Sequence, residues 1–193
     1  MKPVAAIFAL LTVIALAVVP AASSQRGAVW KRLHRPLRLH ALAPGAACPV
    51  SQVDPRIGWP RQHIYGTAGT GHGPVYPGLG TPPVGQVTAA ADTQYGGPWY
   101  GVKVFWYALP RYRGPALIRG RQLDGDGALG FNGQAVPHRE LRIHRGESVS
   151  WTGKVVGSRG LPSEVRVLQP GCYGVQIDGT SFSRLVVFSV ETE

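Results

Sequence analysis

Residues 168–190 constrain the fold more strongly than any other part of this chain. After a Pro-Gly turn, residues 172–178 alternate between apolar side chains and polar or small ones, which is the two-residue period of a half-buried strand. The Asp-Gly-Thr-Ser run at 178–181 predicts a reversal. The return strand, at 182–190, contains consecutive apolar residues at 185–188, as expected for a strand covered on both faces. We therefore expect a β-hairpin that closes an all-β domain.

Strand patterns recur along the rest of the chain. They are found at 47–53, 99–108, 116–123, 140–144, 148–151 and 165–168, with no convincing helical period between them. In the strongest, 99–108, Lys103 marks the partly solvated face. We expect the other face to share one core with the hairpin, made by Val102, Val104 and Trp106 together with Tyr173, Val175 and Ile177. Short strands at this spacing predict a single β-sandwich.

The segment 54–86 interrupts this pattern. It includes the run GTAGTGHGPVYPGLGTPPVG, in which glycine and proline are too frequent for a helix or a regular strand. We expect a long irregular loop, a kind of segment that is often functional when it is ordered. The chain has 26 Gly and 17 Pro, which suits a loop-rich all-β protein.

Residues 1–24 have the pattern of a secretory signal peptide. Lys2 precedes an almost uninterrupted apolar run at 4–19, and the run Pro-Ala-Ala-Ser-Ser follows. Cleavage is expected after Ala21 or Ser23, which would make the mature protein an exported one. The alternative is an uncleaved anchor and a membrane-tethered accessory domain, because the run can cross a thin bilayer and more positive charge follows it than precedes it.

Residues 25–45 are expected to be an extended basic linker, since Pro36 and Pro44 interrupt any helix. The domain itself would span 46–193. The formal net charge of +10 is compatible with anionic partners. However, the basic residues between Arg111 and Arg184 occur singly among strand residues, which indicates solvated strand faces. We expect a monomer with no nucleic-acid partner, and contact with a membrane only if the N-terminal segment is retained.

Cys48 and Cys172 are the only cysteines. In an exported protein such a pair indicates a disulfide more than a reactive or metal-binding thiol. Strand alternation places Cys172 on the face opposite to Tyr173. The bridge would therefore lie outside the core and fasten the N-terminal segment over the terminal hairpin.

Four motifs occur together in this chain: GHGPVYPG, YGVKVFWY, GPALIRGRQLDG and PGCYGVQIDGTSFSRLVVF. In combination they resemble a family of exported, uncharacterised bacterial proteins, and the last motif is similar to the final two strands of bacterial immunoglobulin-like sandwiches. The resemblance runs from about Pro36 to the C-terminus. It implies an exported immunoglobulin-like β-sandwich and carries over no catalytic residues, because no activity is assigned to that family.

Motifs for catalysis or metal binding are incomplete. Asp124 and Asp126 form a DGDG turn without the distal acidic ligand of a calcium loop, so we interpret it as a plain turn. The sequence has no nucleophile elbow, HExxH motif or phosphate-binding loop. Zinc or copper would need ligands that converge in space, and the histidines are scattered: His63, His72, His138 and His144. We expect no cofactor, metal or catalytic residue, with a hydrolase site assembled only in three dimensions as the alternative.

Aromatic residues provide the one binding site that the sequence suggests. Trp59, Trp99 and Tyr100 lie at junctions of loops and strands, near prolines, where they could stack against a sugar ring or a peptide. The alternative is that they fill the core or cover strand faces, as most aromatic residues do in β-proteins. We expect an exported, non-catalytic binding or structural module whose partner is an envelope polymer or protein.

Overall fold

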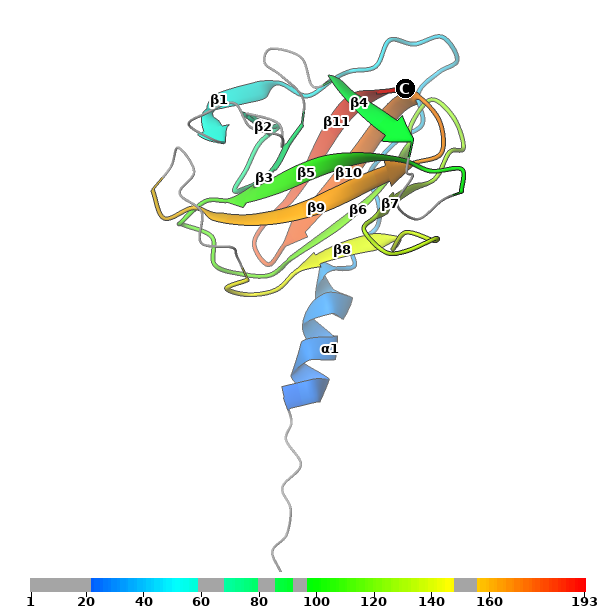
Figure 1. Ribbon diagram of the computed structural model, residues 1–193. Coiled ribbons are helices and arrows are strands. Elements are labelled where there is room, and N and C mark those ends of the chain that lie inside the picture. Colours follow the sequence, from blue (N-terminus) through cyan, green and yellow to red (C-terminus); the bar gives the residue numbers. More distant parts are fainter. Residues whose placement is uncertain (1–21, 59–67, 80–85, 92–96, 148–155) are drawn as a thin grey trace, which may run out of the picture.

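The computed structural model describes residues 22–58, 68–79, 86–91, 97–147 and 156–193 (Figure 1). The predictions for residues 1–21, for 148–151 and for Trp59 lie outside these residues. Within them the chain forms one helix and eleven strands: α1 (Ala22–Leu33), β1 (Val53–Gly58), β2 (Ala68–Thr70), β3 (Val75–Gly78), β4 (Gln86–Ala91), β5 (Tyr100–Ala108), β6 (Ala116–Gln122), β7 (Leu129–Phe131), β8 (Glu140–Ile143), β9 (Arg159–Val167), β10 (Gly171–Gly179) and β11 (Ser183–Thr192).

The strands form one mixed sheet. Its order is β1-β2-β3-β5-β4-β11-β10-β6-β8, and β9 pairs with both β5 and β7. The pair β4–β11 is parallel, and β4 also pairs with β5, so β4 joins the two halves of the sheet. The prediction of an all-β fold is confirmed. The strands are nevertheless hydrogen-bonded into one continuous sheet and not into two separate ones.

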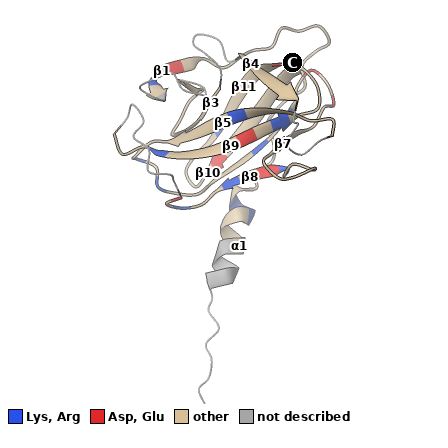
Figure 2. Ribbon diagram, in the orientation of Figure 1, with Lys and Arg blue, Asp and Glu red and all other residues tan. Residues whose placement is uncertain are grey.

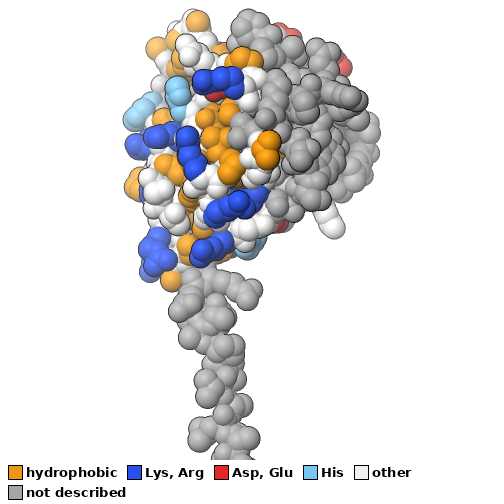
Figure 3. Space-filling view, turned by 90° about the vertical axis from the view of Figure 1, so that its left-hand side faces the viewer, with side chains coloured by type: hydrophobic (Ala, Val, Ile, Leu, Met, Phe, Trp, Pro, Cys, Tyr) orange, Lys and Arg blue, Asp and Glu red, His pale blue; other side chains and the backbone are white. Residues whose placement is uncertain are grey.

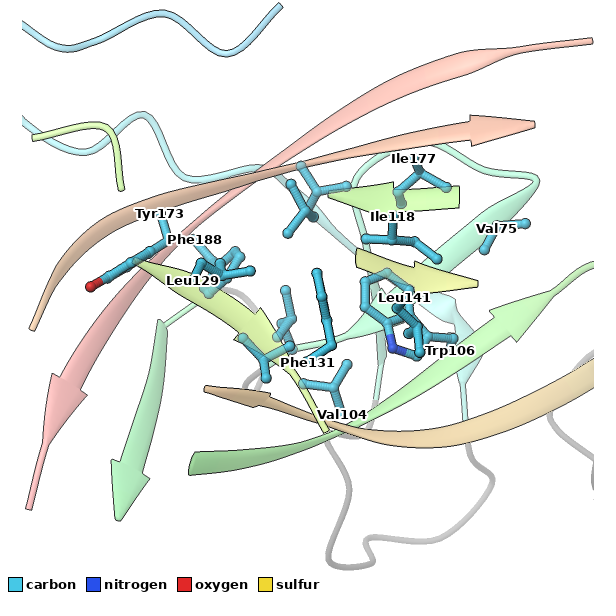
Figure 4. Packing of buried hydrophobic residues seen from close by; sticks show 14 of the residues in the cluster. Val75, Val104, Trp106, Ile118, Leu129, Phe131, Leu141, Tyr173, Ile177 and Phe188 are labelled. Atoms are coloured by element: carbon cyan, nitrogen blue, oxygen red, sulfur yellow. The ribbon is translucent and has the colours of Figure 1, made fainter. Parts of the chain in front are cut away.

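The main core lies between the two halves of the sheet. Strands β5 and β9 contribute residues from one side, and β6, β10 and β11 contribute from the other (Figures 1 and 4). Trp106 is only 1% exposed and donates its indole N–H to Ser163 Oγ at 2.7 Å. The predicted core is confirmed: Val104, Trp106, Tyr173, Val175 and Ile177 are buried together, and Val102 packs against them from a partly buried position.

Tyr173 anchors the start of β10 in this core. Its ring stacks near Phe188 of β11, with 6.2 Å between the ring centroids, and its hydroxyl donates to the carbonyl of Gln169 at 2.7 Å. Burial raises the pKa of Tyr173 to about 12. The phenol therefore belongs in the core in its neutral form.

A second apolar cluster covers the other face of β5. β3 pairs with the last residues of β5, and β2 and β1 extend the sheet from there. The irregular loop expected over 54–86 is therefore wrong for β1, β2 and β3, because backbone pairing and burial override the low strand propensity of glycine and proline. Lys103 is exposed on this face, as predicted, and lies 3.4 Å from Glu164. The buried members of the cluster are Ile57, Tyr76, Phe105, Tyr107 and Leu109.

The hairpin β10–β11 forms as predicted, with Tyr173 opposite Phe188 and Asp178 opposite Ser183. Its reversal is shorter than the sequence predicts. The turn is closed by a hydrogen bond from Gly179 N to Phe182 O at 3.0 Å, whereas Asp178 is a paired strand residue that is fully buried. The prediction of a reversal at 178–181 is therefore wrong at Asp178.

Residues 30–51, which we call the strap, cross the outer face of strands β8, β6, β10 and β11. At the end of α1, Trp30 and Leu33 pack on Leu117 of β6. At the other end, Ser51 donates its backbone N–H to the carbonyl of Val187 at 2.8 Å, and its hydroxyl accepts from Val187 N at 2.9 Å. The extended linker expected at 25–45 is wrong, because the strap is helical at its start and buries apolar side chains along its length.

Between these ends the strap lies close to β10. Leu39 is buried with Leu123 and Cys172. A Cβ atom added to Gly174 would lie 2.7 Å from Leu39 Cδ2, so glycine at this position permits the close approach. Cys172 faces the strap and not the main core, as the alternation predicts.

Two further strand predictions need correction. Residues 47–51 belong to the strap, and residues 47–52 are not a strand, since β1 begins at Val53. The strand predicted at 165–168 is the end of a longer strand, β9, which pairs with β5 from Tyr100 to Ala108. The patterns at 99–108, 116–123 and 140–144 are confirmed as β5, β6 and β8. In the part of the chain that the structure describes, no helix combines the length and the apolar character needed to span a membrane.

Candidate functional site

A buried ion-pair network holds the strap against the sheet. Asp178 on β10 is 0% exposed, and its Oδ2 accepts from Arg119 Nη2 on β6 at 2.9 Å. Arg35 of the strap places Nη1 3.6 Å from Asp178 Oδ1 and donates to the carbonyls of Gly179 and Phe182. Because a buried charge is costly unless it is paired and hydrogen-bonded, this network fixes where the strap lies.

Gln176 completes the network with backbone groups of the strap. Its Nε2 donates to Asp178 Oδ2 at 2.9 Å and to the carbonyl of Pro36 at 3.1 Å. Its Oε1 accepts from the backbone N–H of Arg38 at 2.8 Å. All polar atoms of this buried amide are therefore used to bind the strap.

His34 links the strap to β8. Its Nδ1 lies 3.2 Å from Arg119 Nη1, and its Nε2 lies 3.1 Å from Glu140 Oε2. Since a guanidinium only donates, Nδ1 acts as the acceptor and Nε2 carries the proton toward Glu140. Glu140 also accepts from Arg142, whose guanidinium lies 5.2 Å from the centre of the Trp30 ring. Both ring nitrogens of His34 are thus engaged in holding the strap.

A groove opens where the strap leaves part of the outer face uncovered. It has a volume of about 600 Å³ and lies between the strap, β6, the turn before β7 and the start of β8. Its floor is formed by residues 119–121 of β6, and one wall by residues 126–129. His34 and Leu37 of the strap and Arg139 and Glu140 of β8 form the other walls. This volume is in the range of small-ligand sites.

The carbonyl of Gly120 on β6 is open toward the groove. The N–H of Leu123 bonds to β10, whereas that of Gln122 points to Gly127, so alternation directs the N–H and C=O of Gly120 away from β10. The ladder between β6 and β8 ends at the pair Arg119–Glu140, a register that aims the Gly120 N–H at the carbonyl of Arg139. Among the described residues, no backbone N–H is bonded to the carbonyl of Gly120 on this side.

Two arginines of the groove are also unpartnered. Arg121 and Arg139 are exposed, and neither guanidinium has an ion-pair or hydrogen-bond partner within the described part of the chain. Arg119 is neutralised by Asp178, and Glu140 by Arg142. Asp126 is the remaining acidic side chain in the lining. Counted over the described residues, the groove therefore presents two free cations, one carboxylate and one free backbone carbonyl.

Charges elsewhere on the surface are more dispersed. Lys and Arg residues occur on most elements, and several have an acidic residue beside them (Figure 2). On the side shown in Figure 3, basic side chains surround a patch of hydrophobic ones. A smaller hollow of about 300 Å³ contains Asp54 and Arg56, but these two residues pair with each other at 2.8 Å, and that contact lowers the pKa of Asp54. The charges of Asp54 and Arg56 cancel, so this pair leaves no net charge in the hollow.

The predicted disulfide is confirmed. Cys48 and Cys172 are bonded, with 5.5 Å between their Cα atoms, and the bridge closes a sequence separation of 124 residues. It joins the strap to the start of β10, outside the main core, as predicted. Such a bridge is compatible with an extracellular location.

The structure describes two of the three residues of the predicted aromatic site. Trp59 lies outside the described residues. Trp99 and Tyr100 are partly buried at the start of β5, where Tyr100 packs against the main core and the Arg166 guanidinium lies 5.7 Å from the centre of the Trp99 ring. Neither of these two residues lines the groove.

The structure also describes the DGDG turn and three of the histidines named in the sequence analysis. Asp124 accepts from Gln122 Nε2 and from the backbone N–H of Cys172, both at 2.9 Å, which agrees with the interpretation of a plain turn. His72, His138 and His144 are exposed, and His144 packs its ring edge-on to Trp30. Within the described ranges, no group of three or more His, Cys, Asp or Glu side chains is arranged to hold a metal ion. His63 lies outside those ranges.

The residues of the strap network and the groove are not apparent from the sequence. Gln176 and Asp178 alternate with core residues, which ordinarily indicates a solvent-facing side of a strand. One signal was present: Arg35 lies in a basic segment rich in leucine, which could pack on such a face. Comparisons of the chain with protein-family models, with curated proteins and with solved structures found no match.

Proposed function

We propose that this protein is an exported, non-catalytic binding module of the cell envelope, and that the groove beside the strap is its ligand site. The observation that carries the proposal is the pair of exposed guanidiniums of Arg121 and Arg139, which have no partner among the described residues and line the groove together with the open carbonyl of Gly120. Beside it, a strap held by ion pairs and a disulfide covers part of the outer face. Rigidly held polar groups that lack partners are what a binding site provides.

We further propose that the fold is immunoglobulin-like. The pairing order β4–β5–β9–β7 corresponds to strands A, B, E and D of that sandwich, and β11–β10–β6–β8 corresponds to G, F, C and C′. The bond from the Tyr173 hydroxyl to the carbonyl of Gln169 supports it, since a tyrosine at the start of strand F makes such a bond in these domains. The module departs from the standard form because β7 precedes β8, strands β1–β3 are additional, and the disulfide lies outside the core.

Export is supported by the signal-like pattern of residues 1–24 and by the disulfide. The four sequence motifs that resemble exported bacterial proteins point in the same direction. N-terminal sequencing of protein from its native host should give a chain that begins at Ala22 or Ser24. Recovery of intact Met1 in the membrane fraction would replace this proposal with a tethered domain.

Binding through the groove can be tested by blocking it. Ala128 is exposed in the groove wall, so Ala128→Trp should fill the groove without a change in the core. We expect this variant to lose co-sedimentation with isolated cell envelopes, whereas the parent protein sediments with them. The matched control is Ala135→Trp, at an exposed residue outside the groove, which should behave like the parent. Equal binding by both variants, or no binding by the parent, would contradict the proposal.

A further inference from the structure

We infer that the ligand of this groove is an acidic sugar chain that carries carboxylate groups, of the uronic-acid type. This inference rests on the proposed binding function and names its ligand class. It follows from the kinds of hydrogen-bonding groups that the groove leaves free, and from their charges.

The free donors of the groove suit a carboxylate. Arg121 and Arg139 are exposed and unpartnered among the described residues, and both line the groove. A guanidinium presents a planar fork that matches both oxygens of a carboxylate, and hydrogen bonds between such charged partners are stronger than neutral ones. An anionic group is therefore favoured on this side of the groove.

The free acceptors suit hydroxyl groups. Asp126 is exposed in the lining, and the carbonyl of Gly120 has no partner on the groove side among the described residues. A carboxylate and a carbonyl accept hydrogen bonds and cannot donate them. A ligand that satisfies the whole groove must therefore carry donors as well as a negative charge, and a sugar ring with hydroxyls and one carboxylate does so.

A phosphate chain fits these groups less well. A phosphodiester group offers acceptor oxygens but no donor for Asp126, whereas the sugar ring that carries a carboxylate also carries hydroxyl donors. A neutral sugar would leave Arg121 and Arg139 without an anion. The formal charge of +10 adds a general attraction for any polyanion, so charge alone does not distinguish these ligands.

The experiment is a calorimetric titration of the exported protein with trigalacturonic acid, carried out at low and at moderate salt. We expect saturable binding that weakens at least about tenfold in the variant Arg121→Gln/Arg139→Gln, because two charge-assisted contacts are removed. The matched control is Arg111→Gln/Arg113→Gln, which removes the same charge from two exposed residues outside the groove. Its affinity should stay within about twofold of the parent after salt screening.

Two further titrations distinguish between the possible ligand classes. Neutral galactotriose should bind at least about tenfold more weakly than trigalacturonic acid, since it lacks the anion. Tripolyphosphate should bind no more tightly than trigalacturonic acid, and its binding should be abolished by moderate salt. Tighter binding of tripolyphosphate, or equal losses in the groove and control variants, would overturn the inference.

The outcome is distinguishable from failure of the proposed function. If Ala128→Trp abolishes envelope binding but Arg121→Gln/Arg139→Gln leaves it unchanged, the groove binds a ligand of another class. If the parent protein binds neither envelopes nor trigalacturonic acid, the binding function itself is wrong.

Discussion

Replacing Asp178 with asparagine should loosen the strap and destabilise the whole domain. The Asp178 side chain is 0% exposed and lies within ion-pair distance of Arg119, whose side chain is 10% exposed, and of Arg35, at 35%. Asparagine keeps the size and one acceptor oxygen but removes the charge that both guanidiniums face. Removing one partner of a buried ion pair costs about 3–5 kcal/mol, and we expect about 3 kcal/mol because the amide oxygen still accepts from Arg119.

The assay is guanidinium unfolding of the oxidised protein, with the free energy of unfolding compared between variants. The control is Lys103→Gln, which removes a surface pair whose lysine side chain is 53% exposed and should cost about 0–1 kcal/mol. Limited trypsin digestion should also show faster cleavage after Arg38 in Asp178→Asn, since the strap is held less firmly. Arg119→Met should cost less in the Asp178→Asn background than in the parent, because the two residues act as a pair.

The reasoning would be refuted if Asp178→Asn cost no more than Lys103→Gln. It would also fail if the effects of Asp178→Asn and Arg119→Met were additive, since independent sites add and coupled ones do not.

Three other predictions concern the core, the disulfide and pH. Trp106→Ala should lower the free energy of unfolding by about 3–5 kcal/mol, because Trp106 is 1% exposed; a loss under about 1 kcal/mol would contradict its place in the core. The double variant Cys48→Ser/Cys172→Ser opens a loop of 124 residues, so the free energy of unfolding should fall by up to about 4–5 kcal/mol. Proteolysis should then cleave residues 40–51 before the paired strands. Equal protection of residues 40–51 in this variant and in the parent would contradict the prediction. Burial raises the pKa of Tyr107 and of Tyr173 to about 12, above the usual value of 10.0. Above pH 10 the unfolded state loses these protons before the folded state does, so the free energy of unfolding should fall by about 1.4 kcal/mol for each tyrosine by pH 11. In Tyr107→Phe the contribution of Tyr107 to this fall should be absent. The measurement compares unfolding of the parent and the variant at pH 8 and at pH 11.

The sequence predicts those parts of the fold in which a strand turns one of its two faces toward the core. In β5 and β10 the two-residue period alone identifies the side chains that meet in the core, from Trp106 to Ile177. The same period places Cys172 on the outer face, and the observed bridge lies there. Local alternation carries this information because each side chain's face depends only on its own strand.

The strap could not be predicted in this way. Alternation tells which side chains leave the core, but not whether water or another segment covers them. Gln176 and Asp178 therefore resemble solvent-facing residues, although a segment far away in the sequence buries both. Strands β2 and β3 were missed for a related reason: β3 pairs with β5 and β2 with β3, and these pairings are decided by the partner strands and not by the glycine-rich sequence itself.

The groove depends on features that no local pattern records. It exists because the ladder between β6 and β8 ends at Arg119–Glu140 while β6 continues to Gln122, and His34 and Leu37 of the strap line the space beyond the ladder. The sequence prediction of a site at Trp59, Trp99 and Tyr100 rests on residue type and on local position at loop–strand junctions. Side chains that share a groove come here from four separate segments, which only the tertiary structure brings together.

The most direct test of the account is to map where trigalacturonic acid contacts the protein. Amide chemical shifts of the ¹⁵N-labelled protein should be followed by NMR while trigalacturonic acid is added. The account predicts that the largest changes occur at Gly120, Arg121 and Arg139, with Ala128 beside them, and that they are absent in Arg121→Gln/Arg139→Gln. Changes that cluster at Trp99 and Tyr100, or that spread evenly over the basic surface, would contradict it.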